Sequence, residues 1–143
     1  MPKRLLCCIF LVLMCVSGCD DAPKPKIGIS FGVGEAKRWP AEKGYMEERA
    51  QELGMEVETR FNKADAPKTQ MQDCFELIDS GISVLILIPR DARKANEILA
   101  YAKKKNVKVI SYARAVMGED IDFVGYIPTG SGRVWGCILQ KRP

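Results

Sequence analysis

Apolar residues recur along the chain with two alternating periods between residues 26 and 126. Short runs rich in Ile, Val and Phe predict strands, and stretches with apolar residues three and four positions apart predict amphipathic helices. The predicted strands are Lys26–Phe31, Glu56–Arg60, Ser83–Ile88, Val107–Tyr112 and Ile121–Tyr126. The predicted helices are Trp39–Leu53, Pro67–Ser80 and Asp91–Lys105.

This order of elements predicts an α/β fold, a three-layer doubly wound parallel sheet. The continuous apolar run Ser83–Ile88 is typical of a central strand that is buried on both faces. In such sheets ligands bind beyond the carboxyl ends of the strands, near the point where the strand order reverses. The candidate site segments are therefore Gly32–Trp39, Pro89–Ala92 and Ala113–Arg114, together with the residues after Tyr126.

The first 18 residues have the pattern of an export signal. Lys3 and Arg4 precede the twelve-residue apolar run Leu5–Val16, which is shorter than the roughly 20 residues of a transmembrane helix. A run of this length fits the apolar region of a signal peptide. Residues 1–18 are therefore expected to be a signal peptide, and the cysteine that follows them makes it a lipoprotein signal peptide.

The sequence Val16-Ser17-Gly18-Cys19 resembles a bacterial lipobox. The resemblance implies that Cys19 is lipidated and becomes the first residue, and that residues 19–26 form a lipidated tether stiffened by prolines. The alternative is an ordinary secretory signal followed by a chance cysteine. The expected location is the cell envelope, as a lipoprotein facing the periplasm or the outer face of the cytoplasmic membrane.

Composition excludes several classes of chemistry. The chain has no His, so catalysis by Ser-His-Asp or Cys-His groups and His-containing zinc sites are excluded. After the leader and the lipidated Cys19, only Cys74 and Cys137 remain, so neither a disulfide framework nor a metal site is indicated. Cys74 is expected to be a small core residue. The net charge of +4, which falls to about +2 without the leader, is too small to indicate nucleic acid.

The segment 27–126 resembles a known family through a series of short motifs in order. These are Lys26–Ser30, Arg38-Trp39, Leu53-Gly54, Thr69-Gln70-Met71, Ser80-Gly81, Val84–Pro89, Lys108–Tyr112 and Asp120–Phe123. Together they resemble the N-terminal lobe of periplasmic sugar-binding proteins of ABC transporters, and most closely the D-xylose-binding branch. The resemblance implies one of two similar lobes that close on a monosaccharide, and delivery of that sugar to a membrane permease. It implies no enzyme activity and no cofactor.

The resemblance also implies the residues that hold the sugar. Arg38 would donate hydrogen bonds and Trp39 would stack on the sugar ring; the alternatives are a solvated charge and a core anchor at the helix start. Asp91 is expected either to bind sugar or to cap the third helix. Arg114 is expected to donate to the sugar, with an exposed loop residue as the alternative.

Two departures from the family pattern weaken the expected sugar site. Ala113 stands where the family has an Asp, and residues 127–143 are predicted to be an irregular tail with the second lobe missing. We therefore expect weak or absent sugar binding by this chain alone. We also expect that the chain is a truncated product of a longer binding-protein gene, caused by a frameshift or an early stop near codon 127. The alternative function is a stand-alone sensor or interaction lobe that docks on a permease or receptor without binding sugar.

Overall fold

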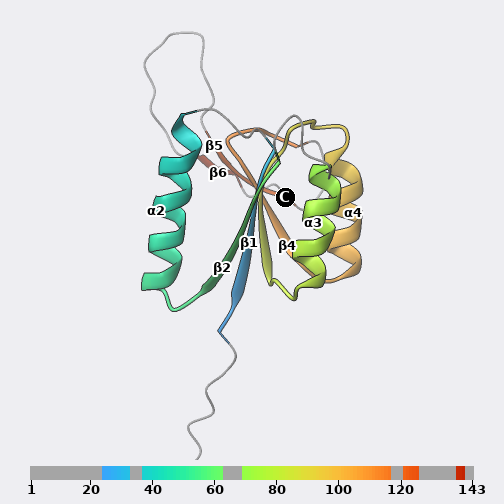
Figure 1. Cartoon of the computed structure of the whole chain (residues 1–143). Helices are drawn as coiled ribbons and strands as arrows, with labels where there is room; N and C mark the ends of the chain where they lie inside the picture. Colours follow the sequence, from blue (N-terminus) through green and yellow to red (C-terminus); the bar gives the residue numbers. More distant parts are fainter. Residues whose placement is uncertain (1–23, 33–36, 63–68, 117–120, 126–137, 141–143) are drawn as a thin grey trace, which may run out of the picture.

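The computed structural model describes residues 24–32, 37–62, 69–116, 121–125 and 138–140. They form one six-stranded sheet in the order β2-β1-β3-β4-β5-β6. The elements are β1 (Lys26–Phe31), α2 (Arg38–Glu52), β2 (Glu56–Phe61), α3 (Gln70–Asp79), β3 (Val84–Ile88), α4 (Ala95–Lys104), β4 (Lys108–Tyr112), β5 (Asp122–Gly125) and β6 (Ile138–Gln140). Helix α2 covers one face of the sheet, and α3 and α4 cover the other (Figure 1).

The predicted fold class is confirmed, since the first five strands pair in parallel and helices lie on both faces. Helix α3 begins at Gln70, three residues later than predicted, because Thr69 caps it. The hydroxyl of Thr69 accepts a hydrogen bond from the backbone N–H of Gln72 at 3.3 Å. The side chain of Gln72 accepts in return from the backbone N–H of Thr69 at 2.9 Å, which completes a capping box.

One prediction was wrong for part of the tail. Residues 127–143 were expected to be irregular, but Ile138–Gln140 form strand β6, antiparallel to β5. The unpaired backbone groups at the outer edge of β5 favour such a partner, and three residues are too few for a hydrophobic period to reveal a strand. The sheet is consequently mixed. The leader, Cys19, Cys137 and the rest of the tail lie outside the described residues.

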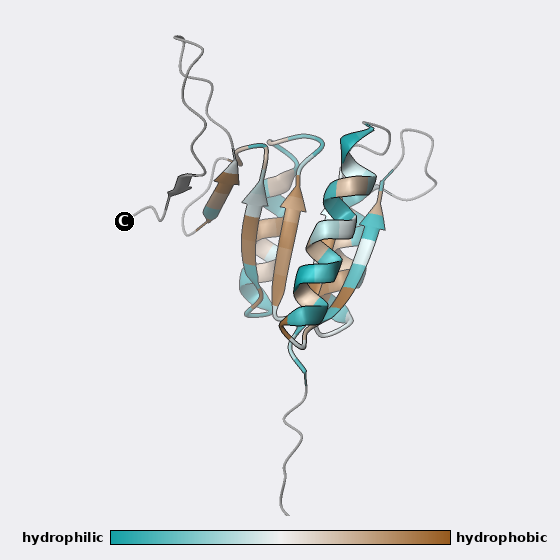
Figure 2. Ribbon diagram, turned by 90° about the vertical axis from the view of Figure 1, so that its left-hand side faces the viewer, coloured by the Kyte–Doolittle hydropathy of each residue, from teal (hydrophilic) through white to brown (hydrophobic). Residues whose placement is uncertain are grey.

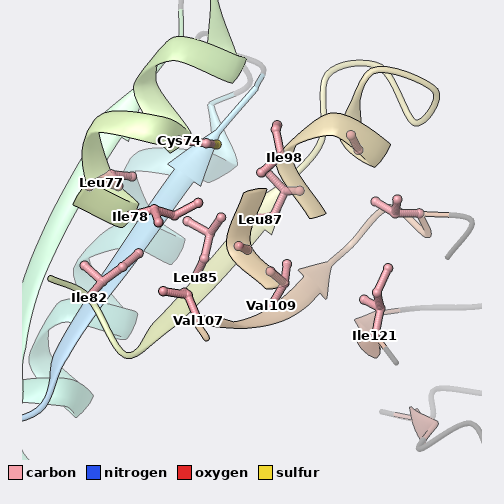
Figure 3. Close-up of a cluster of buried hydrophobic side chains, with 13 residues drawn as sticks. Cys74, Leu77, Ile78, Ile82, Leu85, Leu87, Ile98, Val107, Val109 and Ile121 are labelled. Carbon is pink, nitrogen blue, oxygen red and sulfur yellow. The ribbon is translucent and has the colours of Figure 1, made fainter. Parts of the chain in front are cut away.

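The larger core lies between the sheet and helices α3 and α4 (Figure 3). Leu85 and Leu87 of β3 and Cys74 and Leu77 of α3 are completely buried there. Cys74 is thus the small core residue that its place in the apolar stripe predicts. Burial raises the pKa of its thiol to about 12, so the thiol stays protonated and unreactive.

The smaller core lies under α2 and consists of Ile29, Phe31, Trp39 and Ile88. The ring of Phe31 stacks on that of Phe61 with centroids 4.5 Å apart, which fixes β1 against β2. In Figure 2, drawn from the side of α2, much of this helix has the colours of hydrophilic residues, and strands coloured as hydrophobic lie beside it. Among the described residues, no helix has the length and apolar character needed to cross a membrane.

Candidate functional site

The carboxyl ends of β1, β3 and β4 lie side by side in the sheet. Because β2 and β3 flank β1 on opposite sides, the strand order reverses between β1 and β3, where α/β sheets bind ligands. The backbone N–H of Gly32 donates to the carbonyl of Ile88 at 2.8 Å, which joins the ends of these two strands. The structure thus brings the predicted segments after the first, third and fourth strands to one edge, called here the carboxyl edge.

Gln70, the first residue of α3, ties these segments together. It is 8% exposed, and its amide nitrogen donates to the carbonyl of Ile88 at 2.9 Å and to the hydroxyl of Ser30 at 3.1 Å. Its amide oxygen accepts from the backbone N–H of Arg90 at 2.9 Å. One buried side chain therefore fixes the ends of β1 and β3 and the start of the following loop. A Cβ on Gly32 would lie 2.5 Å from the Gln70 oxygen, so glycine is required there.

A second buried polar contact holds the same loop from β2. The amide of Asn62 donates to the carboxylate of Asp73 at 3.1 Å, and Arg90 donates to the Asn62 oxygen at 3.3 Å. In the sequence, Gln70 stood out only as part of a family motif. The roles of Asn62, Asp73 and Arg90 in holding this loop were not predicted. These residues come from α3 and from the loops after β2 and β3, so no local spacing in the sequence signals their contact.

Trp39 is in the smaller core and is 3% exposed. The ring centroid of Trp39 is 5.7 Å from that of Phe31. The guanidinium carbon of Arg38 lies 4.0 Å from the Trp39 ring centroid. The core-anchor alternative therefore describes Trp39 in this structure, and stacking on a sugar stays a prediction. The Arg38 side chain is 57% exposed and is 3.4 Å from a carboxylate oxygen of Glu42, so it can still turn toward a ligand.

Asp91 is exposed in the loop after β3. Its carboxylate accepts from the backbone N–H of Arg93 at 2.9 Å, and this hydrogen bond is the main reason why the pKa of Asp91 is lowered. The predicted role as helix cap was wrong in its position: α4 begins at Ala95 with Lys94 as its N-cap. Asp91 instead caps the turn that precedes the helix, with its carboxylate still open to solvent.

Arg114 is exposed after β4, and its guanidinium donates to the carbonyl of Pro89 at 3.3 Å. This contact brings Arg114 beside the loop that carries Asp91. The hydroxyl of Ser111 donates to the carbonyl of Arg114. Ala113 between them has a φ of 60°, the left-handed conformation that an Ala side chain disfavours. The described residues contain no group of three or more side chains able to hold a metal ion.

Comparison with known proteins identifies relatives that bind sugars. The D-xylose-binding periplasmic protein of Escherichia coli K12 is 26% identical over 121 residues, which cover 85% of this chain and 36% of that protein. The multiple sugar-binding periplasmic protein SbpA of Azospirillum brasilense is 27% identical over 101 residues, 70% of this chain and 28% of that protein. The chain thus spans about a third of the length of the curated relatives it matches.

Solved structures that are similar to this chain are also solute-binding proteins, and the chain again covers about a third of each. An ABC transporter solute-binding protein of Mycobacterium smegmatis with bound glycerol has a TM-score of 0.66 and 30% identity, covering 71% of this chain and 35% of that one. A carbohydrate transporter solute-binding protein of Chloroflexus aurantiacus in complex with D-glucose has a TM-score of 0.62 and 29% identity, covering 72% and 31%. These are binding proteins, in agreement with the expectation that the chain is not an enzyme.

The family comparison covers most of the chain. The model of the periplasmic binding protein domain matches residues 27–142, which reaches past Tyr126, where the resemblance was expected to end. The match includes all six strands and the three helices described above apart from the first residue of β1. The chain therefore belongs to the periplasmic binding protein domain family.

Proposed function

We propose that the chain supplies a monosaccharide-binding lobe of the solute-binding component of an ABC importer. The observation that carries this proposal is the position of Asp91 and Arg114 on adjoining loops at the carboxyl edge, next to the strand-order reversal, in a chain of this family. Arg38 opens α2 at the same edge. The relatives named for sugar binding support a sugar as the ligand.

The chemistry of these residues suits sugar hydroxyls. Each hydroxyl can donate one hydrogen bond and accept two, so a sugar site needs both donors and acceptors. Arg38 and Arg114 provide donors, and the Asp91 carboxylate provides an acceptor. The buried side chains of Gln70 and Asn62 hold the loop that carries Asp91, which lowers the cost of ordering it when a ligand binds.

The finer assignment is to the D-xylose type. Two of the relatives, from Escherichia coli and Haemophilus influenzae, are named D-xylose-binding periplasmic proteins, with 26% and 28% identity. We propose that the protein is exported, anchored through lipid at Cys19, and delivers its ligand to a membrane permease. Cys19→Ala should move the protein from the membrane fraction to a soluble or unprocessed form; an unchanged membrane fraction would contradict the anchor.

Affinity is expected to be weak for this lobe alone. A sugar held on one side keeps part of its surface in water, whereas ligand sites usually bury 70–90% of a small ligand. Each missing charge-assisted contact costs on the order of 1–3 kcal/mol, and about 1.4 kcal/mol is a factor of ten in affinity. The dissociation constant should therefore be roughly millimolar or weaker.

The test is a titration of the purified protein with pentoses and hexoses, followed by NMR chemical shifts. We expect shifts that saturate in the millimolar range, and their loss in Asp91→Asn combined with Arg114→Gln. Arg49→Gln is the matched control, because Arg49 is exposed near the other end of α2, paired with Glu52 at 2.6 Å. A micromolar constant would contradict the argument for weak binding.

The second candidate is a lobe that docks on a permease or receptor without sugar. The burial of Trp39 and the presence of Ala113 in place of an acid favour it. Retention of a permease from the same genome on the immobilised protein, without any sugar-dependent shift in the titration, would support this candidate. Saturable sugar binding would exclude it.

A further inference from the structure

Trp39 contacts both a buried ring and an exposed cation. It is 3% exposed, and its ring packs beside the completely buried Phe31. The guanidinium of Arg38 lies over the Trp39 ring, with its carbon 4.0 Å from the ring centroid, as expected for a planar cation stacked on an aromatic face. The Arg38 side chain itself is 57% exposed. The guanidinium therefore stands between this face of the Trp39 ring and solvent.

The contacts that hold Arg38 over the ring are weak. Its Nε lies 3.4 Å from a carboxylate oxygen of Glu42, whereas Arg49 and Glu52 on the same helix approach to 2.6 Å. An exposed cation–π contact and an exposed ion pair each shift an equilibrium by only about two- to fivefold. Arg38 can therefore leave the Trp39 ring at a small cost in free energy.

The covered arrangement also leaves polar atoms unpaired. The Nε1 of Trp39 and one carboxylate oxygen of Glu42 are buried and have no hydrogen-bond partner among the described residues. A buried Trp N–H usually has a partner, and a buried donor or acceptor without one keeps its full desolvation cost. Turning the Arg38 and Glu42 side chains toward solvent would hydrate this oxygen. The cost of the unpaired atoms therefore opposes the covered arrangement.

We propose that Arg38 is a gate over Trp39, which covers the ring in the free protein and moves off it when a sugar binds. This inference rests on the proposed function and gives Arg38 control of access to Trp39 besides its role as a donor. Moving Arg38 exposes the face of the indole ring and frees the guanidinium N–H groups for sugar hydroxyls. The core-anchor and sugar-platform roles of Trp39 then correspond to two positions of the Arg38 side chain.

The gate has a measurable consequence for affinity. When only the open form binds, the apparent dissociation constant is the intrinsic one divided by the open fraction. A change that weakens the hold on Arg38 without removing it should therefore tighten sugar binding. Glu42→Gln is such a change, because it keeps the shape of the side chain and removes the charge that faces Arg38.

The first test measures access to the Trp39 ring without any sugar. The sequence has two Trp residues, so Trp135→Phe leaves Trp39 as the only indole fluorophore. Acrylamide is the quencher, because it is neutral and is not attracted or repelled when a charge is removed. We expect its quenching constant to rise about two- to fivefold in Arg38→Ala and in Glu42→Gln. Glu52→Gln, which removes the same charge near the other end of α2, should leave it unchanged.

A second reading does not depend on the Trp135 substitution. The indole N–H of Trp39 can be followed by NMR in the chain with both Trp residues, and its exchange with water should be faster in Arg38→Ala and Glu42→Gln. Circular dichroism checks that each variant keeps its fold. A local opening changes the signal of Trp39 and leaves the circular dichroism spectrum as in the wild type.

The second test titrates the full chain with D-xylose and D-glucose. We expect Glu42→Gln to bind the sugar about two- to fivefold more tightly than the wild type, because its open fraction is larger and Arg38 remains as a donor. Arg38→Ala should not show this gain, since it loses the donor together with the gate. Glu52→Gln should bind as the wild type does.

The outcomes separate this inference from the proposed function. If the quenching of Trp39 is unchanged in Arg38→Ala and Glu42→Gln, or rises equally in Glu52→Gln, Arg38 is not the cover and the gate is wrong, whatever the sugars do. If quenching rises but Glu42→Gln binds sugar no more tightly than Glu52→Gln, sugar binding stands and the gate is overturned. If neither the wild type nor a variant binds a sugar, the proposed function fails, and sugar-driven opening fails with it.

Discussion

The two faces of the sheet differ in how deeply they bury the same kind of residue. On the face covered by α3 and α4, Leu85 and Leu87 of β3 are completely buried. On the face of α2, their neighbour Ile86 and its register partner Ile110 are only partly buried. Of the described helices, α2 alone lies on this face, and it packs against β2 at the edge of the sheet (Figure 1).

The comparison shows that burial of a strand depends on the layer above it more than on the strand sequence. Val84–Ile88 is apolar at every position, yet alternate residues have different surroundings. The stability of this lobe should therefore come mainly from the α3 and α4 face. The α2 face contributes through the Phe31, Trp39 and Phe61 rings and the buried Ile29 and Ile88, and less through Ile86 and Ile110.

The largest expected effect is the loss of Leu87. Leu87→Ala removes a completely buried side chain and should lower the free energy of unfolding by about 2–5 kcal/mol, because it leaves a cavity. Ile110→Ala on the partly buried face should cost clearly less, on the order of 1–2 kcal/mol. Urea unfolding followed by circular dichroism measures both. Equal losses would mean that the two faces are equally covered in solution.

The next largest effect is expected at Gln70, which lies at the start of α3 on the more deeply buried face of the sheet. Gln70→Leu leaves the Ile88 carbonyl and the Arg90 N–H without their side-chain partner and should cost about 1–3 kcal/mol. The amide of Arg90 should also exchange faster with deuterium, which a general loss of packing would not confine to one loop. Gln72→Leu is the control: Gln72 is exposed, and its loss should cost only about 0.5–1 kcal/mol from the cap. A larger effect for Gln72 would contradict the role given to Gln70.

The hydrophobic period predicted the fold well because every predicted helix and the central strands have at least one face in a core. Cys74 and Ile78 of the α3 stripe lie in the larger core, as do Leu85 and Leu87 of β3. The period could not predict Gln70 as the link between strand ends, because a polar residue at a helix start has the same pattern whether it is buried or exposed. Nor could it predict β6, whose three residues are fixed by the edge of β5 rather than by their own sequence.

The placement of candidate site residues was predicted to the level of the segment. Asp91 and Arg114 lie at the edge where the strand order places a ligand, and Arg114 donates to Pro89 beside Asp91. The environment of a side chain was harder to predict, as Trp39 illustrates. An aromatic residue after the first strand fits a sugar platform and a core anchor equally well. In this structure Trp39 packs against Phe31 as a core residue, and its stacking on a sugar stays a prediction.

A smaller effect distinguishes the two ends of β4. Asn106 before the strand and Ala113 after it both have a left-handed φ, of 59° and 60°. Asn tolerates this conformation, whereas Ala is strained by roughly 1–2 kcal/mol. Ala113→Gly should therefore stabilise the protein, by about 1 kcal/mol after the added freedom of the unfolded chain is counted. Asn106→Gly should change stability little. Destabilisation by Ala113→Gly would show that contacts of the Ala113 methyl group outweigh its backbone strain.

The smallest effect concerns the ion pairs at the amino ends of the strands. The hydrogen bond from Lys26 holds the pKa of Glu58 below its usual value, with further contributions from Ser80 and Arg60. Because the folded pKa is the lower one, this stabilisation is complete above the unfolded pKa of Glu and is lost as the pH falls through the folded pKa. The pair is partly exposed, so its loss should cost less than about 1 kcal/mol. Glu58→Gln should flatten the decline of stability between neutral and acidic pH, whereas Glu56→Gln, at an exposed neighbour on the same strand, should leave it as in the wild type. An unchanged decline in Glu58→Gln would assign the acid sensitivity to other carboxylates, with Asp79, whose pKa is lowered by Lys105, as the next to replace.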